Sequence, residues 1–156
     1  MKKILFLVVA LAITNVASAQ ENVIKVNPLG LAFGITNAGY EFATNDTQSL
    51  TVSGVYFNVS DITGVGAGLE YRFYFKGEAI QGWHAGPVVG YMSLKDSFSN
   101  SASIFTVGGE VGHQWVLNGG FAIDVFGGYA AFIGGDNLTG LSGGGATFGV
   151  AIGYAW

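Results

Sequence analysis

The fold of this chain is decided by residues 64–75, GVGAGLEYRFYF. Every odd-numbered position in this stretch is apolar, and every even-numbered position is small, charged or hydroxylated. The apolar positions are Val65, Ala67, Leu69, Tyr71, Phe73 and Phe75. A period of two is the geometry of a β-strand, whereas a helix would need apolar residues three and four positions apart. The other face carries Glu70 and Arg72, the only arginine of the chain. A strand that is apolar outside and polar inside is typical of a transmembrane β-barrel.

The composition of the whole chain agrees with this strand. The 156 residues suffice for one domain; 50% are hydrophobic, only 10% are charged, and 26 are glycine. A soluble domain carries about 25% charged residues, yet no apolar run here reaches the roughly 20 residues that a membrane-spanning helix needs. The two observations agree if apolar residues occupy alternate positions of strands. Because cysteine is absent, a disulfide framework and a thiolate metal site are excluded.

Residues 1–19 are predicted to form a cleaved secretory signal peptide. Lys2 and Lys3 form its basic start, residues 4–13 its apolar core, and residues 17–19, ASA, the cleavage site before Gln20. The chain therefore divides into a signal peptide, 1–19, and a barrel domain, 20–156. The mature chain keeps four basic and ten acidic residues, a net charge of 4 − 10 = −6. An acidic chain without a basic cluster is a poor candidate for binding nucleic acid.

The same alternation predicts eight strands, separated by turn residues. Their ranges are 23–35, 38–44, 49–58, 64–75, 83–94, 102–116, 121–133 and 146–156. Asn27-Pro28 interrupts the first strand and indicates a bulge, so the facing of Lys25 stays open. An even number of strand-turn units predicts one all-β, antiparallel up-and-down barrel. Both termini would lie on the periplasmic side, and the connections at 36–37, 59–63, 95–101 and 134–145 would face the cell exterior.

The positions of the charged residues test whether the predicted strands form a membrane barrel. Of the fourteen in the mature chain, eight lie at the terminus or in predicted turns and loops, Lys25 is undecided, and none lies clearly on the lipid face. The other five have inward parity: Glu41, Glu70, Arg72, Glu110 and Asp124. A basic residue facing lipid at mid-depth would cost about 2–4 kcal/mol, so this distribution favours a membrane barrel.

Together with His84, which also has inward parity, these five residues form the predicted lumen network. A buried guanidinium must be paired, and an eight-stranded barrel has an interior just wide enough for side chains to fill. We therefore expect a salt-bridged network that plugs the lumen; a selectivity ring or a catalytic acid pair is the alternative. His113 has outward parity, and neither histidine shows a pairing with serine and acid. We expect no catalytic, cofactor or metal site.

Five outward-facing aromatic residues lie near predicted strand ends: Tyr71, Trp83, Trp115, Tyr154 and Trp156. They could stack on carbohydrate, but their parity favours an aromatic girdle at the lipid headgroups.

The last strand ends in FGVAIGYAW, residues 148–156, with apolar residues at alternate positions and an aromatic last residue. In this pattern the mature chain resembles the small eight-stranded outer-membrane β-barrel proteins of Gram-negative bacteria, of the OmpA/OmpX-like kind. The opening VNPLGLAFG followed by GYE also resembles uncharacterised members of that class.

The resemblance implies residence in the bacterial outer membrane, with lipid and lipopolysaccharide as surroundings. It also implies contact with periplasmic chaperones and the barrel assembly machinery during biogenesis. The implied assembly signal is Phe148, Val150, Ile152, Tyr154 and Trp156.

The leading functional hypothesis is a non-enzymatic outer-membrane barrel whose exposed loops, 95–101 and 134–145, contact partners, including an extracellular ligand of unknown nature. The alternatives are a narrow pore, a lipid-modifying enzyme, and a soluble lipocalin-like carrier with its aromatic face inside. The carrier would have an exterior of glycine and alanine with few charges, which is a poor soluble surface.

Overall fold

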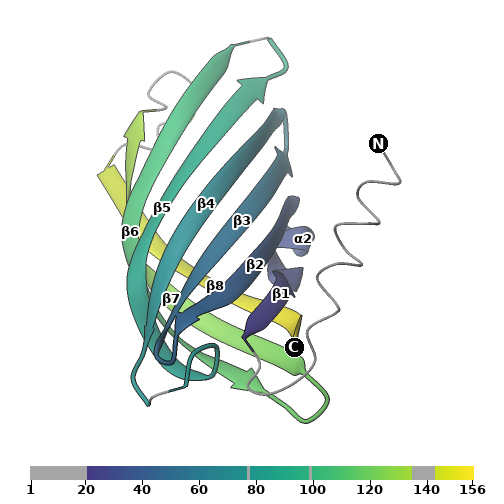
Figure 1. The fold of residues 1–156 in the computed structure, drawn as a ribbon. Coiled ribbons are helices and arrows are strands. Elements are labelled where there is room, and N and C mark those ends of the chain that lie inside the picture. The colour runs from purple at the N-terminus through teal and green to yellow at the C-terminus, as the bar shows by residue number, and fades with distance from the viewer. Residues whose placement is uncertain (1–20, 77, 99, 135–142) are drawn as a thin grey trace.

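The computed structural model describes residues 21–76, 78–98, 100–134 and 143–156. Over these residues eight strands, paired antiparallel in chain order, close into one barrel (Figure 1). The strands are β1 (Asn22–Val26), β2 (Ile35–Asn45), β3 (Gln48–Val59), β4 (Ile62–Tyr74), β5 (Gly82–Asp96), β6 (Ser101–Val116), β7 (Phe121–Gly134) and β8 (Gly143–Ala155). The barrel closes where β1 pairs with β8, from Val23 opposite Ala155 to Val26 opposite Ile152. This confirms the predicted antiparallel up-and-down barrel; the predicted signal peptide and residues 135–142 of the last loop lie outside the described residues.

Strand β4 has the two faces that its sequence predicts. Leu69 and Phe73 are 45% and 43% exposed, whereas Arg72 is 2% exposed. The inward face of the barrel is therefore the polar one, and the reversed arrangement of a lipocalin-like carrier does not occur in this strand.

The first connection differs from the prediction. The predicted strand 23–35 is wrong beyond Val26, because α2 (Pro28–Ala32) follows it, and residues 36–37 lie within β2 instead of forming a link. The side-chain oxygen of Asn27 accepts a hydrogen bond from the backbone N–H of Gly30 at 3.1 Å, and proline occupies the first helical turn. Asparagine followed by proline is a helix start signal. Here the pair begins a short helix instead of forming the predicted bulge.

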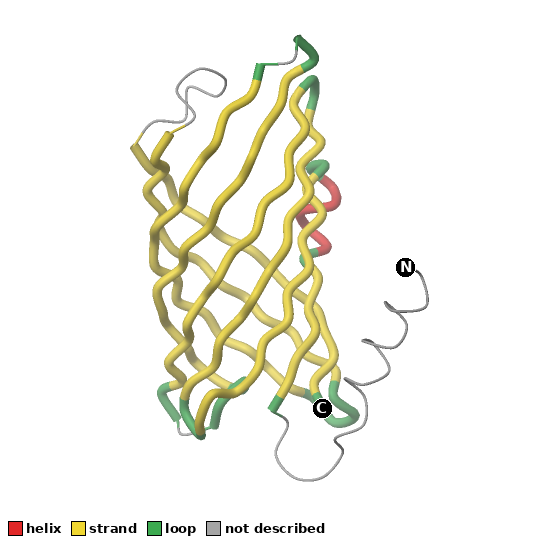
Figure 2. The backbone as a smooth tube through the Cα atoms, turned by 45° about the horizontal axis from the view of Figure 1, so that its top comes forward, coloured by secondary structure: helices red, strands yellow, loops and turns green. Residues whose placement is uncertain are grey.

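Because β1 ends at Val26, a strand covers only part of the wall between β2 and β8. Helix α2 contacts both of these strands and lies beside the barrel wall, where Figure 2 shows it in red. The chain then turns at Gly34, whose φ of 77° favours glycine. The carbonyl of Gly34 accepts a hydrogen bond of 2.8 Å from the backbone of Asn58 on β3.

The two ends of the barrel carry different connections. The end with the connections that follow β2, β4 and β6, the lower end in Figure 1, also holds Trp156. The carbonyl of Trp156 accepts a 3.0 Å hydrogen bond from the backbone of Glu21. At the upper end β5 and β6 rise above their neighbours (Figure 1). There the predicted loop 95–101 is shorter than expected, since Lys95 pairs with Ser101 in the ladder.

A cluster of four buried apolar residues lies at the lower mouth of the barrel. Ile80, from the connection between β4 and β5, is 1% exposed and packs with Val23, Ala122 and Ala155. Its φ is 63°, a costly conformation for a β-branched residue. Gln114 Nε2 donates a 2.7 Å hydrogen bond to the carbonyl of Ile80, so burial and this bond hold the residue in place. We call these four apolar residues the lower lid.

Glycines on the inward face leave room for larger neighbours. A Cβ on Gly112 of β6 would lie 2.7 Å from His84 Nε2, which is closer than real Cβ contacts. Gly109, on the outward face of the same strand, would meet nothing closer than a backbone oxygen at 3.7 Å. The absence of a side chain at Gly112 thus allows His84 to stay inside.

We predict that Gly112→Ala lowers the free energy of unfolding by about 1–3 kcal/mol through overpacking. Gly109→Ala, the matched control on the same strand, should leave it unchanged or slightly raised. Urea unfolding in detergent micelles, followed by tryptophan fluorescence, measures both. Equal stability of the two variants would contradict the packing of His84 against Gly112.

Candidate functional site

A layer of buried charged side chains crosses the barrel interior, and Arg72 of β4 is at its centre. Its Nη1 lies 2.7 Å from Asp124 Oδ2 and 3.6 Å from Glu41 Oε2, and its Nη2 lies 2.7 Å from Glu70 Oε2. Asp124, Glu41 and Arg72 are each at most 2% exposed. Alternation in β2, β4 and β7 turns these side chains inward, and the closed barrel brings them together across the interior.

Lys25, whose facing the sequence left open, points inward and is 5% exposed. Its Nζ donates to Glu41 Oε2 at 2.7 Å, to Gln114 Oε1 at 3.1 Å and to Asp124 Oδ2 at 3.2 Å. Helix α2 begins only after β1 has ended, so Lys25 keeps the parity of buried Val23. In the sequence, the inward carboxylates outnumber the single arginine. This excess is the signal that could have indicated a second inward-facing cation.

Polar side chains that the sequence prediction did not include complete this layer. Ser49 Oγ and Tyr74 Oη donate to Glu41 Oε1 at 2.5 and 2.6 Å. Gln114 Nε2 lies within 3.2 Å of Glu41 Oε2 and also donates to Ile80 of the lower lid. The inward parity of Ser49, Tyr74 and Gln114 in their strands is the signal that could have found them.

His84 of β5 is fully buried at the edge of the layer. Its Nε2 lies 3.0 Å from Asp124 Oδ1 and 3.4 Å from Arg72 Nη1. The hydroxyl nucleophile that an acyl-transfer site requires is not among its hydrogen-bond partners in the described residues. We call Lys25, Glu41, Glu70, Arg72, His84 and Asp124 the charged network.

Glu110, the sixth residue of the predicted lumen network, lies apart from these contacts. It faces inward on β6 and lines a cavity of about 120 Å³ together with Glu70. None of the ion pairs found among the described residues includes Glu110. The structure thus brings together five of the six predicted residues in direct contacts and leaves Glu110 at the cavity.

The described parts of the chain contain no group of three or more histidine, aspartate or glutamate side chains suited to holding a metal ion. Within the same ranges, no helix is long and apolar enough to cross a bilayer.

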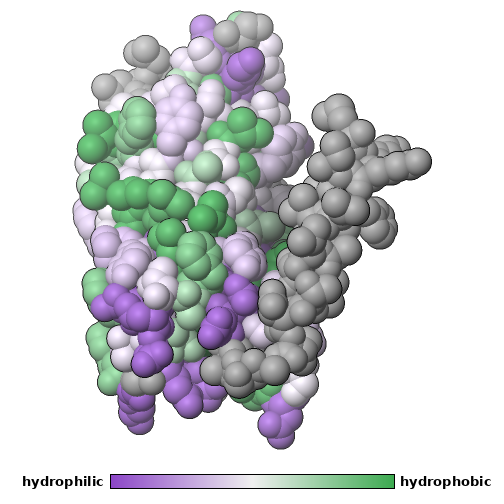
Figure 3. All heavy atoms as spheres, viewed as in Figure 1, coloured by the Kyte–Doolittle hydropathy of each residue, from purple (hydrophilic) through white to green (hydrophobic). Residues whose placement is uncertain are grey.

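The exterior of the barrel carries a continuous aliphatic belt. Val52, Leu69, Val89 and Val107 are successive register neighbours on β3, β4, β5 and β6. Each is between 43% and 51% exposed. In Figure 3 hydrophobic side chains occupy the middle of the visible face, and hydrophilic ones gather toward its lower edge.

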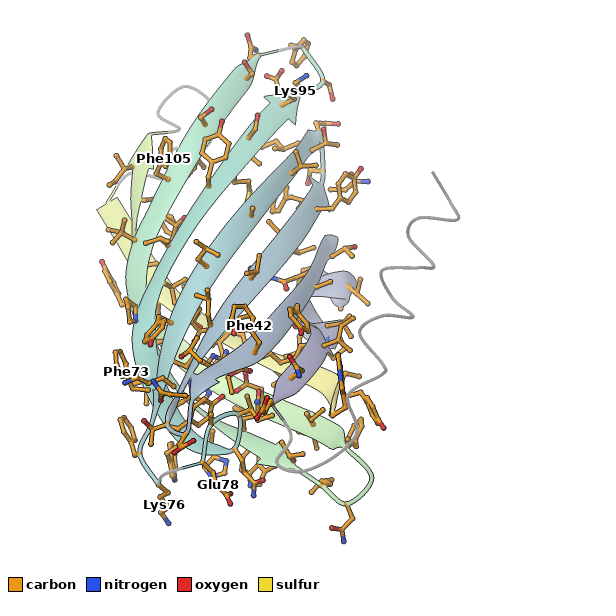
Figure 4. The ribbon with its side chains drawn as sticks, in the orientation of Figure 1. Phe42, Phe73, Lys76, Glu78, Lys95 and Phe105 are labelled. Carbon is orange, nitrogen blue, oxygen red and sulfur yellow. The ribbon has the colours of Figure 1, made fainter. Side chains whose placement is uncertain are left out.

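Aromatic residues flank this belt. The five predicted girdle residues all lie near the lower strand ends, and His113 lies between the rings of Trp83 and Trp115, with centroids 5.0 and 4.2 Å away. Tyr91 and Phe105 form a second pair toward the upper end, with ring centroids 4.9 Å apart. Figure 4 shows Phe105 near the upper end and Phe73 near the lower end. The sequence prediction did not include this upper pair.

The five residues implied as an assembly signal share one face of the last strand. Phe148 and Tyr154 are 83% and 55% exposed, and Val150, Ile152 and Trp156 are partly exposed with the same parity. Asn22 accepts a 3.0 Å backbone hydrogen bond from Trp156, so the same segment closes the barrel.

We predict that Arg72→Met lowers the free energy of unfolding by about 3–5 kcal/mol, because it leaves buried carboxylates without their partner. Lys76→Met, which removes an exposed cation at the lower end, should change it by less than about 0.5 kcal/mol. Urea unfolding compares the two variants. Adding Glu70→Gln to Arg72→Met should recover part of the loss; an Arg72 variant as stable as the Lys76 control would contradict the network.

Comparison with known proteins gives a family and no activity. No curated protein matches the chain. The model of the family described as "Protein of unknown function (DUF3575)" matches residues 4–136. That range runs from before the barrel to the end of β7, and the chain therefore belongs to this family.

Proposed function

We propose that this chain is an integral outer-membrane β-barrel protein, non-enzymatic, with a lumen closed by its own side chains and with loops that serve structural or surface-interaction roles. The observation that carries the proposal is the division of side chains between the two faces. Aliphatic residues such as Leu69 and Val107 face outward, while Arg72, Glu41 and Asp124 are buried inside.

The energetics of this division favour lipid as the surrounding medium. Soluble monomers rarely expose a contiguous apolar surface beyond a few hundred Å², and buried ionised groups are costly unless paired. The exposed apolar exterior and the pairing of the charged residues inside are both expected if the exterior of the barrel contacts hydrocarbon. A closed barrel also satisfies its backbone hydrogen bonds between strands, which spanning a bilayer requires.

The aromatic residues support a particular placement in the membrane. Trp83, Trp115 and Tyr154 near the lower end would form a girdle at one headgroup region, and Tyr91 and Phe105 a counterpart at the other. The lower end, with Trp156, would face the periplasm, and the upper loops the cell exterior. The alternating outward residues of β8 would serve as the signal for the barrel assembly machinery, after transit with periplasmic chaperones.

The interior supports a closed lumen. Ile80 occupies the lower mouth, and Gln114 links it to the charged network directly above. An eight-stranded barrel leaves little space beyond its own side chains. The cavity beside Glu110 favours the second candidate, a narrow pore, but this cavity of about 120 Å³ lies next to the charged network instead of passing through it.

We predict that Leu69→Arg lowers the stability of the barrel in phosphatidylcholine vesicles by about 2–4 kcal/mol, because Leu69 lies mid-strand on the outward face. Phe98→Arg, at a hairpin tip where Phe98 is 87% exposed, should be neutral. Urea unfolding from vesicles measures both variants. If the outward face met water, both substitutions would change stability by less than about 0.5 kcal/mol, and the membrane proposal would fail.

We predict that the wild-type barrel gives no steady current in planar bilayers. A lower mouth filled by Ile80 and a lumen crossed by paired charges would leave no continuous aqueous path. Ile80→Gly, which opens the lower lid, should still conduct little, because the charged network remains. A steady single-channel current from the wild-type protein would contradict the closed lumen and support the pore.

A further inference from the structure

A groove lies at the lower rim of the barrel, between the connection from β4 to β5 and the lower end of β6. Strand β5 begins at Gly82, opposite Gln114, whereas β6 continues to Val116. The side chains of Lys76 and Gln81, from the connection, line the groove beside this end of β6. Its volume is about 260 Å³, just below the roughly 300–1,000 Å³ of a pocket for a drug-sized ligand, so it suits a headgroup better than a whole lipid.

Two opposite charges line this rim groove. They belong to Lys76 and Glu78, which are both exposed. Figure 4 shows both residues at the lower end of the barrel. Neither belongs to an ion pair or a side-chain hydrogen bond found among the described residues. A cation and an anion that share a groove without pairing with each other suit a ligand that carries both charges.

An aromatic and aliphatic wall borders the rim groove on the outward face of β6. Trp115 and Leu117 line it and are 44% and 49% exposed. His113 also lines it, and its ring is held between the rings of Trp83 and Trp115. Indole rings favour the depth of a bilayer at which headgroups meet acyl chains. The groove therefore offers charged groups and apolar surface together, as an amphiphile requires.

We propose that the rim groove binds the headgroup of a phospholipid that carries a primary ammonium beside its phosphate, as phosphatidylethanolamine does. The Nζ of Lys76 would donate to the phosphate, and the carboxylate of Glu78 would accept hydrogen bonds from the ammonium. The glycerol and the first methylenes of the acyl chains would lie against Trp115 and Leu117. This proposal rests on the membrane location proposed above and names the lipid that the lower end selects.

The two charges also exclude other headgroups. A purely anionic headgroup, such as phosphatidylglycerol, would bring its phosphate to Lys76 but leave Glu78 without a cation. A choline headgroup has the same net charge as ethanolamine, but its quaternary ammonium has no N–H group to donate to Glu78. The expected order of affinity is therefore ethanolamine above choline, with the carboxylate of Glu78 as the cause of the difference.

The test offers the folded barrel, in nonionic detergent, an equimolar mixture of phosphatidylethanolamine and phosphatidylcholine with matched acyl chains. Native mass spectrometry then counts the first lipid bound. Phosphatidylethanolamine should be enriched about threefold, the size expected of an ion pair that stays partly exposed. Glu78→Gln should abolish this enrichment, whereas Glu21→Gln, the same change in an exposed carboxylate at the lower end, should retain it.

The phosphate contact is tested separately. Lys76→Gln should weaken the binding of both lipids by about threefold, because both carry the same phosphate. Lys95→Gln, the matched change in an exposed lysine at the upper end, should leave the binding unaltered.

Equal binding of the two lipids to the wild-type barrel would overturn the proposal. An enrichment that persists in Glu78→Gln, or Lys76→Gln binding as tightly as Lys95→Gln, would do the same, since either would place the headgroup elsewhere. Free phosphoethanolamine that binds as tightly as the lipid would also overturn it, because the apolar wall would contribute nothing. The Leu69→Arg measurement does not involve the rim groove, so a lack of lipid selectivity would leave the proposed function standing.

Discussion

A buried ion pair offsets the cost of removing its charges from water only when its geometry is good. Arg72 has such geometry with Glu70 and Asp124, both at 2.7 Å, and the other buried charged side chains lie around it. Gly112 leaves the space for His84, and Gln114 ties the paired charges to the lower lid. Removing the guanidinium would therefore disturb side chains of four strands at once, β2, β4, β5 and β7.

The period-two pattern of the strands determines the exterior of the barrel as well as the interior. Where a carboxylate faces inward, the residues before and after it face outward, so the apolar belt and the charged interior arise together. A slip of one residue in register would exchange the two faces. The irregularity in β2 lies between Ala43 and Asn45, beyond Glu41, and therefore does not move this carboxylate from the inside.

Most of the fold could be predicted from the sequence, because each strand carries its own two-faced pattern. The inward parity of Glu41 and Asp124 follows from single strands in this way. The short helix could not be separated from a bulge by periodicity, since five residues are too few to show a helical repeat; only Asn27-Pro28 carried the signal. The position of Ile80 in the lower lid could not be predicted from the sequence either, because its positive φ contradicts the preference of a β-branched side chain.

Contacts across the barrel depend on register, which no single strand encodes. Four inward-facing carboxylates are possible partners of Arg72 by parity alone. Only the ladder shows that Glu110 lies between Gly86 and Gly128 and apart from the guanidinium. Lys25 is the converse case. Its inward facing follows from the alternation in β1 once the end of that strand is known. Its three hydrogen-bond acceptors come from three other strands.

The claim that the outward face meets lipid can be measured directly, since the chain has no cysteine and single-cysteine variants carry one spin label each. Labels at Val52, Leu69, Val89 and Val107 in vesicles would be read by electron paramagnetic resonance with oxygen and a water-soluble nickel chelate. We expect high access to oxygen and low access to the chelate at all four positions, and the reverse at Phe98 in the hairpin tip. Ready access of the chelate to the four belt positions would contradict this claim.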